Sequence, residues 1–333
     1  MKVLVLGGSG YIGSRLCTLL QGSRWADVVT ASSGRHGASP DLQVDTCDPA
    51  GMEQALRGID AVVNCVAGDA RSIATGAQVL AAAAIAQGCM RIVHLSSMSV
   101  YGAQEGELAE QAGTGPSLGW YGRAKCEAER RIQGFADAGG TAIVLRPGCV
   151  WGPGSVLWVE RIGEWLRAGR LGDLGAAGDG WSNLVHVDDV CRAVLAGLRL
   201  PLPARSVRGF NLAGPDSPRW NEFFVDLGMA IGATPVRRIP RAQIVLDAWL
   251  GGPPLQAARL VLGRLGGRPG SLPRPLTPGL VALWRRHLRL DCTAAARELR
   301  LAWTSYETSL RQSADWYLKA APVSVPAAHR QQL

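Results

Sequence analysis

Three residues of the chain, a serine, a tyrosine and a lysine, are spaced in a way that suits proton transfer at a hydroxyl or carbonyl group. Ser97 follows an apolar run, and Tyr121 and Lys125 stand at positions i and i+4 of a predicted helix. Side chains at that spacing share one helix face. A phenol with its ordinary pKa of about 10 is a poor base at neutral pH, but a nearby ammonium favours the phenolate. Because a serine hydroxyl can hydrogen-bond a charged substrate oxygen, the three residues predict an acid–base site.

A glycine-rich turn near the start of the chain predicts a phosphate-binding site. Gly7, Gly10 and Gly13 come directly after the apolar run 3–6 and open a predicted helix over 12–21. Glycines at these places permit a tight turn, close approach of the backbone to a pyrophosphate, and close packing of helix on strand. The helix N-terminus then offers unpaired N–H groups to the phosphates. A glycine turn without a ligand is the alternative, which the position at the first strand–helix junction disfavours.

The elements that must position these residues follow from the hydrophobic pattern. Short apolar runs alternate with helical stretches, which is typical of a parallel sheet with helices on both faces. The predicted strands are 3–6, 27–31, 61–65, 91–95 and 142–145, and the predicted helices are 12–21, 52–57, 74–87, 121–138, 158–168, 188–198, 291–299 and 308–318. Beyond residue 150 glycine and proline become frequent, and 234–280 has no clear period, which predicts a second, less regular lobe.

Several motifs resemble those of the extended short-chain dehydrogenase/reductase superfamily, also called the NAD-dependent epimerase/dehydratase family. They are the G-x-x-G-x-x-G loop at 7–13, the run Ser96-Ser97-Met98-Ser99-Val100-Tyr101-Gly102 followed by Tyr121 and Lys125, the segment Arg146-Pro147 to Gly154, and the segment Asn183 to Val190. The resemblance is good over roughly residues 1–233 and thin beyond. It implies that Ser97 is the catalytic serine, with Ser96 and Ser99 as alternatives, that Tyr121 is the acid/base, and that Lys125 also contacts the nicotinamide ribose.

The resemblance also implies the architecture. We expect an α/β protein with a Rossmann doubly wound parallel sheet and a smaller C-terminal substrate-binding lobe. The expected NAD(P)-binding domain comprises 1–155 with returning segments at about 180–213, and the expected lobe comprises about 156–179 and 214–318. Residues 319–333 are expected to form a loosely ordered tail.

The segment after the second predicted strand bears on the choice of cofactor. It reads Thr30-Ala31-Ser32-Ser33-Gly34-Arg35 and holds no carboxylate. An acid at this place would bind the ribose 2′-hydroxyl of NAD, whereas hydroxyls and an arginine suit a 2′-phosphate. NADP(H) is therefore favoured, NAD(H) is the alternative, and a plain polar surface loop is the structural alternative. The expected cofactor-binding residues are Gly7, Gly10, Tyr11, Ile12, Gly13, Ser32, Ser33, Arg35, Asp45, Ala67, Lys125 and Pro147.

Two departures from family motifs bear on the reaction. Dehydratases carry an acid pair directly after the catalytic residue, where this chain has Met98 and Ser99. Nucleotide-sugar binders usually place a diphosphate-binding arginine in a G-D-G-x-x-x-R stretch, near which this chain has Ser182. The first departure argues against dehydration, and the second argues against a nucleotide-sugar substrate. The expected substrate contacts are instead Met98, Ser99, Trp120, Trp151 and Trp181, of which Trp151 replaces the usual tyrosine. The family match makes His186 a structural residue, in spite of the neighbouring Asp188.

These features predict an NADP(H)-dependent carbonyl reductase or alcohol dehydrogenase acting on a largely apolar small molecule. A nucleotide-sugar epimerase that retains its cofactor is the alternative, and a cofactor-binding scaffold or redox sensor without turnover is a third interpretation. The intact Ser97, Tyr121 and Lys125 set argues against the third. A homodimer through the helices 74–87 and 121–138 is a further implication of the resemblance.

Composition limits the partners. A net charge of +8 and a pI of about 9.3 suit anionic ligands, but no nucleic-acid-binding motif accompanies them, so no nucleic-acid partner is expected. Arg285, Arg286 and Arg289 form the densest basic cluster and are expected mostly on one exposed helix face. Eight cysteines without a C-x-x-C pair predict reduced thiols and no metal site. Since no apolar stretch reaches about 18 residues, no integral membrane segment and a cytoplasmic location are expected.

Overall fold

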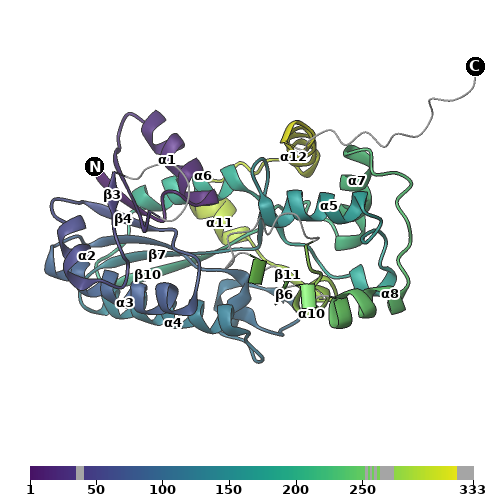
Figure 1. Ribbon diagram of the computed structural model, residues 1–333. Helices are drawn as coiled ribbons and strands as arrows, with labels where there is room; N and C mark the ends of the chain where they lie inside the picture. The colour runs from purple at the N-terminus through teal and green to yellow at the C-terminus, as the bar shows by residue number, and fades with distance from the viewer. Residues whose placement is uncertain (35–40, 252–253, 256, 259–260, 263–273, 321–333) are drawn as a thin grey trace, which may run out of the picture.

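A parallel sheet forms the centre of the protein (Figure 1). The computed structural model describes residues 1–34, 41–251, 254–255, 257–258, 261–262 and 274–320, so Arg35 and the predicted tail beyond residue 320 lie outside the described residues. The sheet has seven strands in the order β10-β7-β5-β4-β1-β2-β3. The direction of strand progression reverses between β1 and β4, which is the switch point of a doubly wound sheet. This confirms the predicted Rossmann-type α/β fold.

The central strands of the sheet are apolar on both faces. The seven strands are β1 (Lys2–Leu6), β2 (Asp27–Ser32), β3 (Leu42–Gln43), β4 (Ala61–Asn64), β5 (Arg91–Leu95), β7 (Thr141–Pro147) and β10 (Ser206–Leu212). Successive side chains of a strand point to opposite faces, so Val3 and Val5 join one hydrophobic cluster while Leu4 and Leu6 join another. Burial of both faces is why the parallel strands read as continuous apolar runs.

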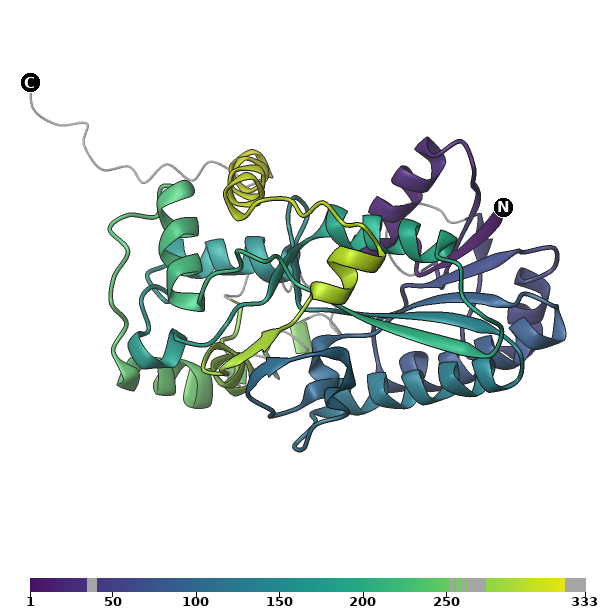
Figure 2. The same cartoon turned by 180° about the vertical axis from the view of Figure 1, so that it is seen from behind.

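Helices cover the two faces of the sheet (Figures 1 and 2). One layer comprises α1 (Tyr11–Gly22), α6 (Val187–Arg199) and α11 (Thr293–Glu298), and the other comprises α2 (Pro49–Ala55), α3 (Ala70–Ala86) and α4 (Trp120–Asp137). Two helices begin earlier than predicted because an aspartate caps each. The Asp69 carboxylate accepts from the Ser72 N–H at 2.8 Å, and the Asp48 carboxylate accepts from two N–H groups of α2.

A second group of elements lies beyond the carboxyl edge of the sheet, on the right of Figure 1. Its helices are α5 (Arg161–Arg167), α7 (Trp220–Ala230), α8 (Arg241–Val245), α10 (Pro278–Trp284) and α12 (Tyr306–Ala320), with shorter turns η1 (Met98–Tyr101), η2 (Glu110–Ala112), η3 (Val156–Glu160), η4 (Gly175–Gly178) and η5 (Leu246–Gly251). Two small parallel pairs join β11 (Leu288–Leu290) to β6 (Gly106–Leu108) and β8 (Cys149–Trp151) to β9 (Leu184–His186). Helix α11 is shorter than the helix predicted over 291–299, because Asp291 and Cys292 connect it to strand β11. No helix of the described residues is long and apolar enough to cross a membrane.

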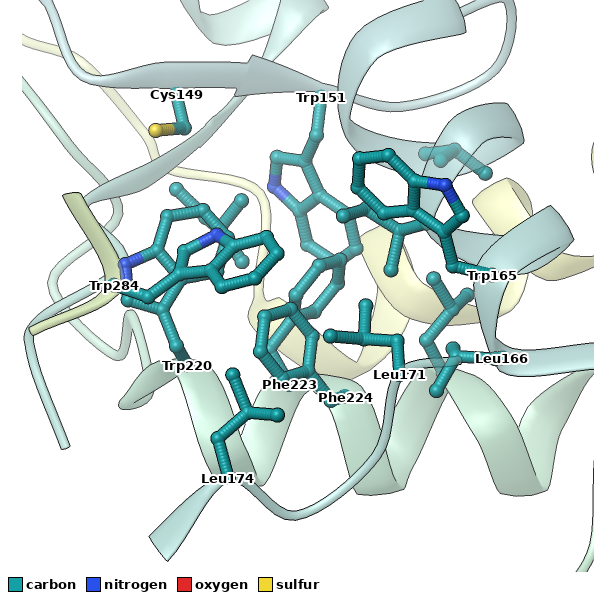
Figure 3. Close-up of a cluster of buried hydrophobic side chains, with 14 of the residues drawn as sticks. Cys149, Trp151, Trp165, Leu166, Leu171, Leu174, Trp220, Phe223, Phe224 and Trp284 are labelled. Atoms are coloured by element: carbon teal, nitrogen blue, oxygen red, sulfur yellow. The ribbon is translucent and has the colours of Figure 1, made fainter. Parts of the chain in front are cut away.

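The core of this second group is unusually aromatic (Figure 3). Trp220 and Trp284 have ring centres 6.4 Å apart, and Phe224 lies edge-on to Trp284 at 5.1 Å. Trp151 packs edge-on against Phe223 at 5.3 Å. Aromatic pairs of this kind add to the free energy of burial, so the lobe has a well-packed core of its own.

A chain of polar contacts ties the two groups of elements together. The Glu129 carboxylate forms a bidentate ion pair with Arg146, whose guanidinium also donates to the Tyr101 hydroxyl at 3.1 Å. The Tyr101 hydroxyl donates to the Asn211 side-chain oxygen at 2.6 Å. The buried Asn211 amide then donates to the last carbonyl of β6 at 3.0 Å and to the carbonyl just after β11 at 3.2 Å. Helix α4, the sheet and the strand pair of the lobe are thus connected through satisfied buried polar groups.

Candidate active site

A cavity of about 1270 Å³ opens at the carboxyl ends of β1, β2, β4 and β5, where doubly wound sheets bind ligands. Its far wall comes from η3 and from the end of α10. Most of the residues predicted from the sequence line it, namely Gly7, Gly10, Tyr11, Ile12, Gly13, Ser32, Ser33, Asp45, Ala67, Ser97, Met98, Ser99, Tyr121, Lys125 and Pro147. Segments far apart in the sequence therefore meet at one place. Of the predicted residues that the structure describes, only Trp120, Trp151 and Trp181 are not among the lining residues, and Arg35 lies outside the described residues.

The glycine loop has the geometry that a pyrophosphate needs. Gly7 has a φ of +77°, and a Cβ on Gly13 would lie 2.1 Å from the Gly7 carbonyl oxygen, so neither position accepts a side chain without rearrangement. Gly10 caps α1 without a side-chain hydrogen bond, and the first turn of α1 contains no acid. The N–H groups of that turn, at Tyr11 and Ile12, are therefore available to an anion at the cavity wall.

The end of the cavity near β2 lacks a carboxylate in the place that NAD would use. Ser32 and Ser33 line it, and the Ser32 hydroxyl accepts from the Gly34 N–H at 3.3 Å. The carboxylate of Asp41, near the middle of β2, binds the Thr30 N–H at 2.7 Å and does not line the cavity. Neutral donors at this place fit a 2′-phosphate as well as a hydroxyl. Sequence reasoning missed Arg71, which lines the cavity from the start of α3.

Lys125 is held between the ends of two central strands. It is 2% exposed, and its ammonium donates to the Leu95 carbonyl at 2.7 Å and to the Val66 carbonyl at 3.1 Å. Burial lowers its pKa to about 8. The ammonium lies 5.8 Å from the centre of the Tyr121 ring, whose own pKa is raised by burial. The site thus holds a phenol and an ammonium group close together, and both are largely shielded from water.

Ser97 differs from its neighbouring serines in its hydrogen bonds. Its hydroxyl oxygen accepts from the Ser99 hydroxyl at 2.8 Å and from the Ser99 N–H at 3.2 Å, which leaves the Ser97 proton free to be donated. The Ser96 hydroxyl instead donates to the Glu129 carboxylate. Of the three serines considered from the sequence, Ser97 therefore has the arrangement of a donor to a bound oxygen atom.

The three predicted substrate tryptophans lie elsewhere. Trp120 is exposed at the start of α4, and Trp151 is 2% exposed and stacks on Tyr306 with ring centres 5.6 Å apart. Trp181 lies between the guanidinium groups of Arg219 and Arg289, at 4.6 and 4.7 Å from its ring centre. Apolar residues that the sequence did not single out also line the cavity, among them Val156, Leu157, Trp158 and Leu283. Val156, Leu157 and Trp158 come directly after the motif that ends at Gly154, and this position could have predicted that they line the cavity.

His186 has a structural position, as the resemblance implied. Its ring Nδ1 accepts from the Asp188 N–H at 3.2 Å and so caps α6. The Asp188 carboxylate is bound by Arg15 at 2.5 and 2.9 Å. Neither His186 nor Asp188 is among the cavity-lining residues.

Comparisons with known proteins agree with this fold. A 2-alkyl-3-oxoalkanoate reductase of Stenotrophomonas maltophilia is 33% identical over 218 residues, which are 59% of this chain and 64% of that protein. An uncharacterized protein of Sinorhizobium fredii is 26% identical over an alignment that covers 94% of this chain and 78% of that protein. The match to the reductase thus spans less than two thirds of its length.

Solved structures show the same architecture. UDP-glucose 4-epimerase of Thermotoga maritima, solved with UDP-glucose, has a TM-score of 0.72 at 22% identity and covers 96% of this chain and 99% of its own. A UDP-glucose-4-epimerase of Stenotrophomonas maltophilia with bound NAD has a TM-score of 0.70, also at 22% identity, over 95% of this chain and 98% of its own. At this identity the likeness concerns the fold.

The family itself is shown by sequence. The model of the NAD dependent epimerase/dehydratase family matches residues 3–213. That range includes the glycine loop, Ser97, Tyr121, Lys125 and most of the central sheet. Because it covers more than half of the 333 residues, this protein belongs to the NAD-dependent epimerase/dehydratase family.

Proposed function

We propose that the protein is an NADP(H)-dependent oxidoreductase that interconverts a carbonyl and a hydroxyl group on a largely apolar small molecule. The observation that carries the proposal is the meeting of Ser97, Tyr121 and Lys125 on one cavity with the glycine loop. When bound, the nicotinamide cofactor supplies or accepts the hydride. A cofactor-binding scaffold would not need the three side chains.

The side chains have separate tasks in this proposal. Ser97 donates a hydrogen bond to the substrate oxygen and stabilises the charge that develops there. Tyr121 gives its phenolic proton to that oxygen during reduction and takes it back during oxidation. Lys125 holds positive charge near the phenol, which favours the phenolate form. Its two carbonyl contacts fix the ammonium in place, at 2.7 and 3.1 Å.

The apolar wall supports an apolar substrate. Val156 and Leu157 are 47% and 54% exposed although they line the cavity, and Trp158 and Leu283 extend the same wall. Apolar side chains left open in a cavity gain free energy when a ligand covers them. The name of the curated relative, a 2-alkyl-3-oxoalkanoate reductase, also supports reduction of a molecule with alkyl substituents.

NADP(H) is the proposed cofactor, because Ser32 and Ser33 rather than a carboxylate line the cavity at the end of β2. NAD(H) is the second candidate, since several solved relatives of the same fold contain NAD. Titration of the purified protein with NADPH and NADH, followed by energy transfer from tryptophan to the reduced nicotinamide, tests the choice. Tight binding of NADPH and weak binding of NADH is expected, and the opposite order would overturn it.

A nucleotide-sugar epimerase is the alternative function, favoured by the epimerases among the solved structures. Net turnover of free cofactor separates the two functions. A reductase consumes one NADPH for each carbonyl reduced, whereas an epimerase interconverts UDP-sugars with no net consumption. Consumption of NADPH with a panel of long-chain ketones and 3-oxo compounds is expected. Epimerisation of UDP-glucose by protein that holds its cofactor without exchange would replace the proposal.

A further inference from the structure

The cavity wall formed by η3 and the end of α10 carries an arginine among apolar side chains. Arg286 lies between α10 and β11 and lines the cavity together with Val156, Leu157 and Leu283. The sequence predicted that Arg285, Arg286 and Arg289 lie mostly on one exposed helix face, and this was wrong. Helix α10 ends at Trp284, before the first of these arginines. Arg285 is exposed, whereas Arg286 is half-buried and lines the cavity. Arg289 is exposed on strand β11.

The backbone of Arg286 is fixed from two sides. Its N–H donates to the Leu283 carbonyl at 3.1 Å, and its carbonyl accepts from the Trp181 N–H at 3.1 Å. A Cβ on Gly180 would lie 2.5 Å from the Arg286 carbonyl oxygen, so this close approach depends on glycine. The side chain therefore starts from a rigid position on the cavity wall, as a preorganised binding group requires.

The guanidinium of Arg286 is in direct contact with no carboxylate in the described part of the chain. No described residue forms a hydrogen bond or an ion pair with its guanidinium. The acidic residues of the cavity lining are Asp45 and Asp69, which belong to the segments after β3 and β4 on the glycine-loop side. Burial lowers the pKa of Arg286, and Glu105 opposes this only in part.

A partly desolvated guanidinium without a partner costs free energy that an anionic ligand recovers. A carboxylate fits best, because it accepts two parallel hydrogen bonds from a guanidinium and carries a single charge. A diphosphate would need further donors. Ser182, near the place of the arginine that nucleotide-sugar enzymes use, is fully buried and donates to the Pro218 carbonyl at 2.6 Å.

We infer that Arg286 binds the carboxylate of the substrate, so that the substrate class is an amphipathic oxo or hydroxy acid whose alkyl chain lies along Val156, Leu157 and Leu283. The inference rests on the proposed function, since it assigns a subsite of the same cavity. It adds a charged recognition point to a wall that is otherwise apolar.

Binding of a non-reacting probe pair tests this subsite. Octanoate and methyl octanoate have the same chain and differ by the carboxylate charge. Their affinities for the full chain are measured by calorimetry, with and without saturating NADP⁺. Octanoate is expected to bind roughly 10- to 100-fold more tightly than the ester, in keeping with a charge-assisted hydrogen bond.

Two substitutions and one control locate the effect. Arg286→Leu is expected to abolish the preference for octanoate over the ester, and Arg286→Lys is expected to retain part of it. Arg285→Leu is the matched control, because Arg285 is exposed and lines a different hollow beside Trp249, and it is expected to leave the preference unchanged. Thermal unfolding of each variant checks that the fold is intact, and the Lys variant keeps the test informative if the Leu variant does not fold.

The outcomes separate this inference from the proposed function. Equal affinity for acid and ester, or a preference that survives in Arg286→Leu, overturns the carboxylate subsite. Binding of UDP-glucose that depends on Arg286, without binding of octanoate, assigns Arg286 to phosphate and also overturns it. Octanoate binding that depends on Arg286 in a protein that binds neither NADPH nor NADH would uphold the subsite and refute the oxidoreductase proposal instead.

Discussion

The Ser99 hydroxyl donates a hydrogen bond to the Ser97 hydroxyl oxygen at 2.8 Å. This contact occupies an acceptor site of Ser97, which lines the cavity, and leaves the Ser97 proton free to be donated. Ser99 then positions Ser97 without itself moving a proton. The relationship leads to the first prediction.

Ser99→Ala is expected to lower kcat by about threefold to tenfold, the effect of losing one neutral hydrogen bond, because Ser97 loses its orienting partner. Cofactor affinity should stay unchanged. Ser99→Thr, which keeps the hydroxyl, should restore the rate. Steady-state kinetics with NADPH and a long-chain ketone checks this, and equal rates for Ala and Thr variants would show that Ser99 has no positioning role.

Tyr121→Phe is expected to lower kcat by about 100-fold to 10,000-fold, the usual contribution of an acid–base group, and to leave the NADPH dissociation constant nearly unchanged. The ring stays in place while the proton donor is lost. Single-turnover oxidation of NADPH followed at its absorption maximum measures the step. Undiminished turnover in this variant would favour a different proton donor.

Gly13→Ala is expected to destabilise the fold by about 2–3 kcal/mol, as overpacking does, and to abolish cofactor binding. The added Cβ would lie 2.1 Å from the Gly7 carbonyl oxygen. Gly22→Ala is the matched control in the same helix, where a Cβ meets no atom within 4 Å. Urea unfolding should separate the two variants, and similar stability for both would contradict the tight packing of the loop.

Lys125 should make stability depend on pH in a defined window. Burial lowers its pKa from 10.5 to about 8, so between these values the unfolded chain binds more protons than the folded one. The free energy of unfolding of the wild type, minus that of Lys125→Met, should therefore rise by about 2 kcal/mol from pH 8 to pH 10.

Denaturant unfolding of both proteins at the two pH values measures this difference, since other titrating groups contribute to both proteins alike. Lys2→Met serves as the control, because Lys2 is exposed, and it should show no such trend. A difference between wild type and Lys125→Met that does not change with pH would contradict the lowered pKa.

Ser32→Asp should shift the cofactor preference. A carboxylate at the end of β2 would repel a 2′-phosphate and accept hydrogen bonds from a 2′-hydroxyl. We expect NADPH to bind about 10- to 100-fold more weakly and NADH to bind more tightly. Tryptophan energy-transfer titrations with both cofactors give each constant, and unchanged constants would place the 2′ group away from Ser32.

Local patterns were enough to predict five of the seven strands of the sheet, the helices that cover it and the residues of the glycine loop, but not β3 and β10. Val3 to Leu6 are apolar without alternation because both faces of β1 are buried. The glycines of the loop follow immediately, so the same stretch of sequence predicts both the strand and the loop at its end. Tyr121 and Lys125 were predictable for a similar reason, since their spacing within one helix determines their shared face.

The far wall of the cavity could not be predicted in this way. Trp151 and Trp158 look alike in the sequence. Only the packing of α7 and α12 decides that Trp151 contacts Phe223 and Tyr306 while Trp158 lines the cavity. Arg286 owes its position to contacts with Gly180 and Trp181, about a hundred residues earlier in the chain. Helical periodicity carries no information on such distant contacts.

The pairing of β6 with β11 has a consequence for the order in which the site forms. Leu288 to Leu290 pair with Gly106 to Leu108, and the Asn211 amide links both to the main sheet. During synthesis a chain that has not yet reached Leu288 lacks both the strand that anchors the Arg286 wall and helix α11, which covers part of one face of the sheet. Such distant pairings form late because they close long loops. The complete cavity wall therefore forms only after the chain has been made as far as β11.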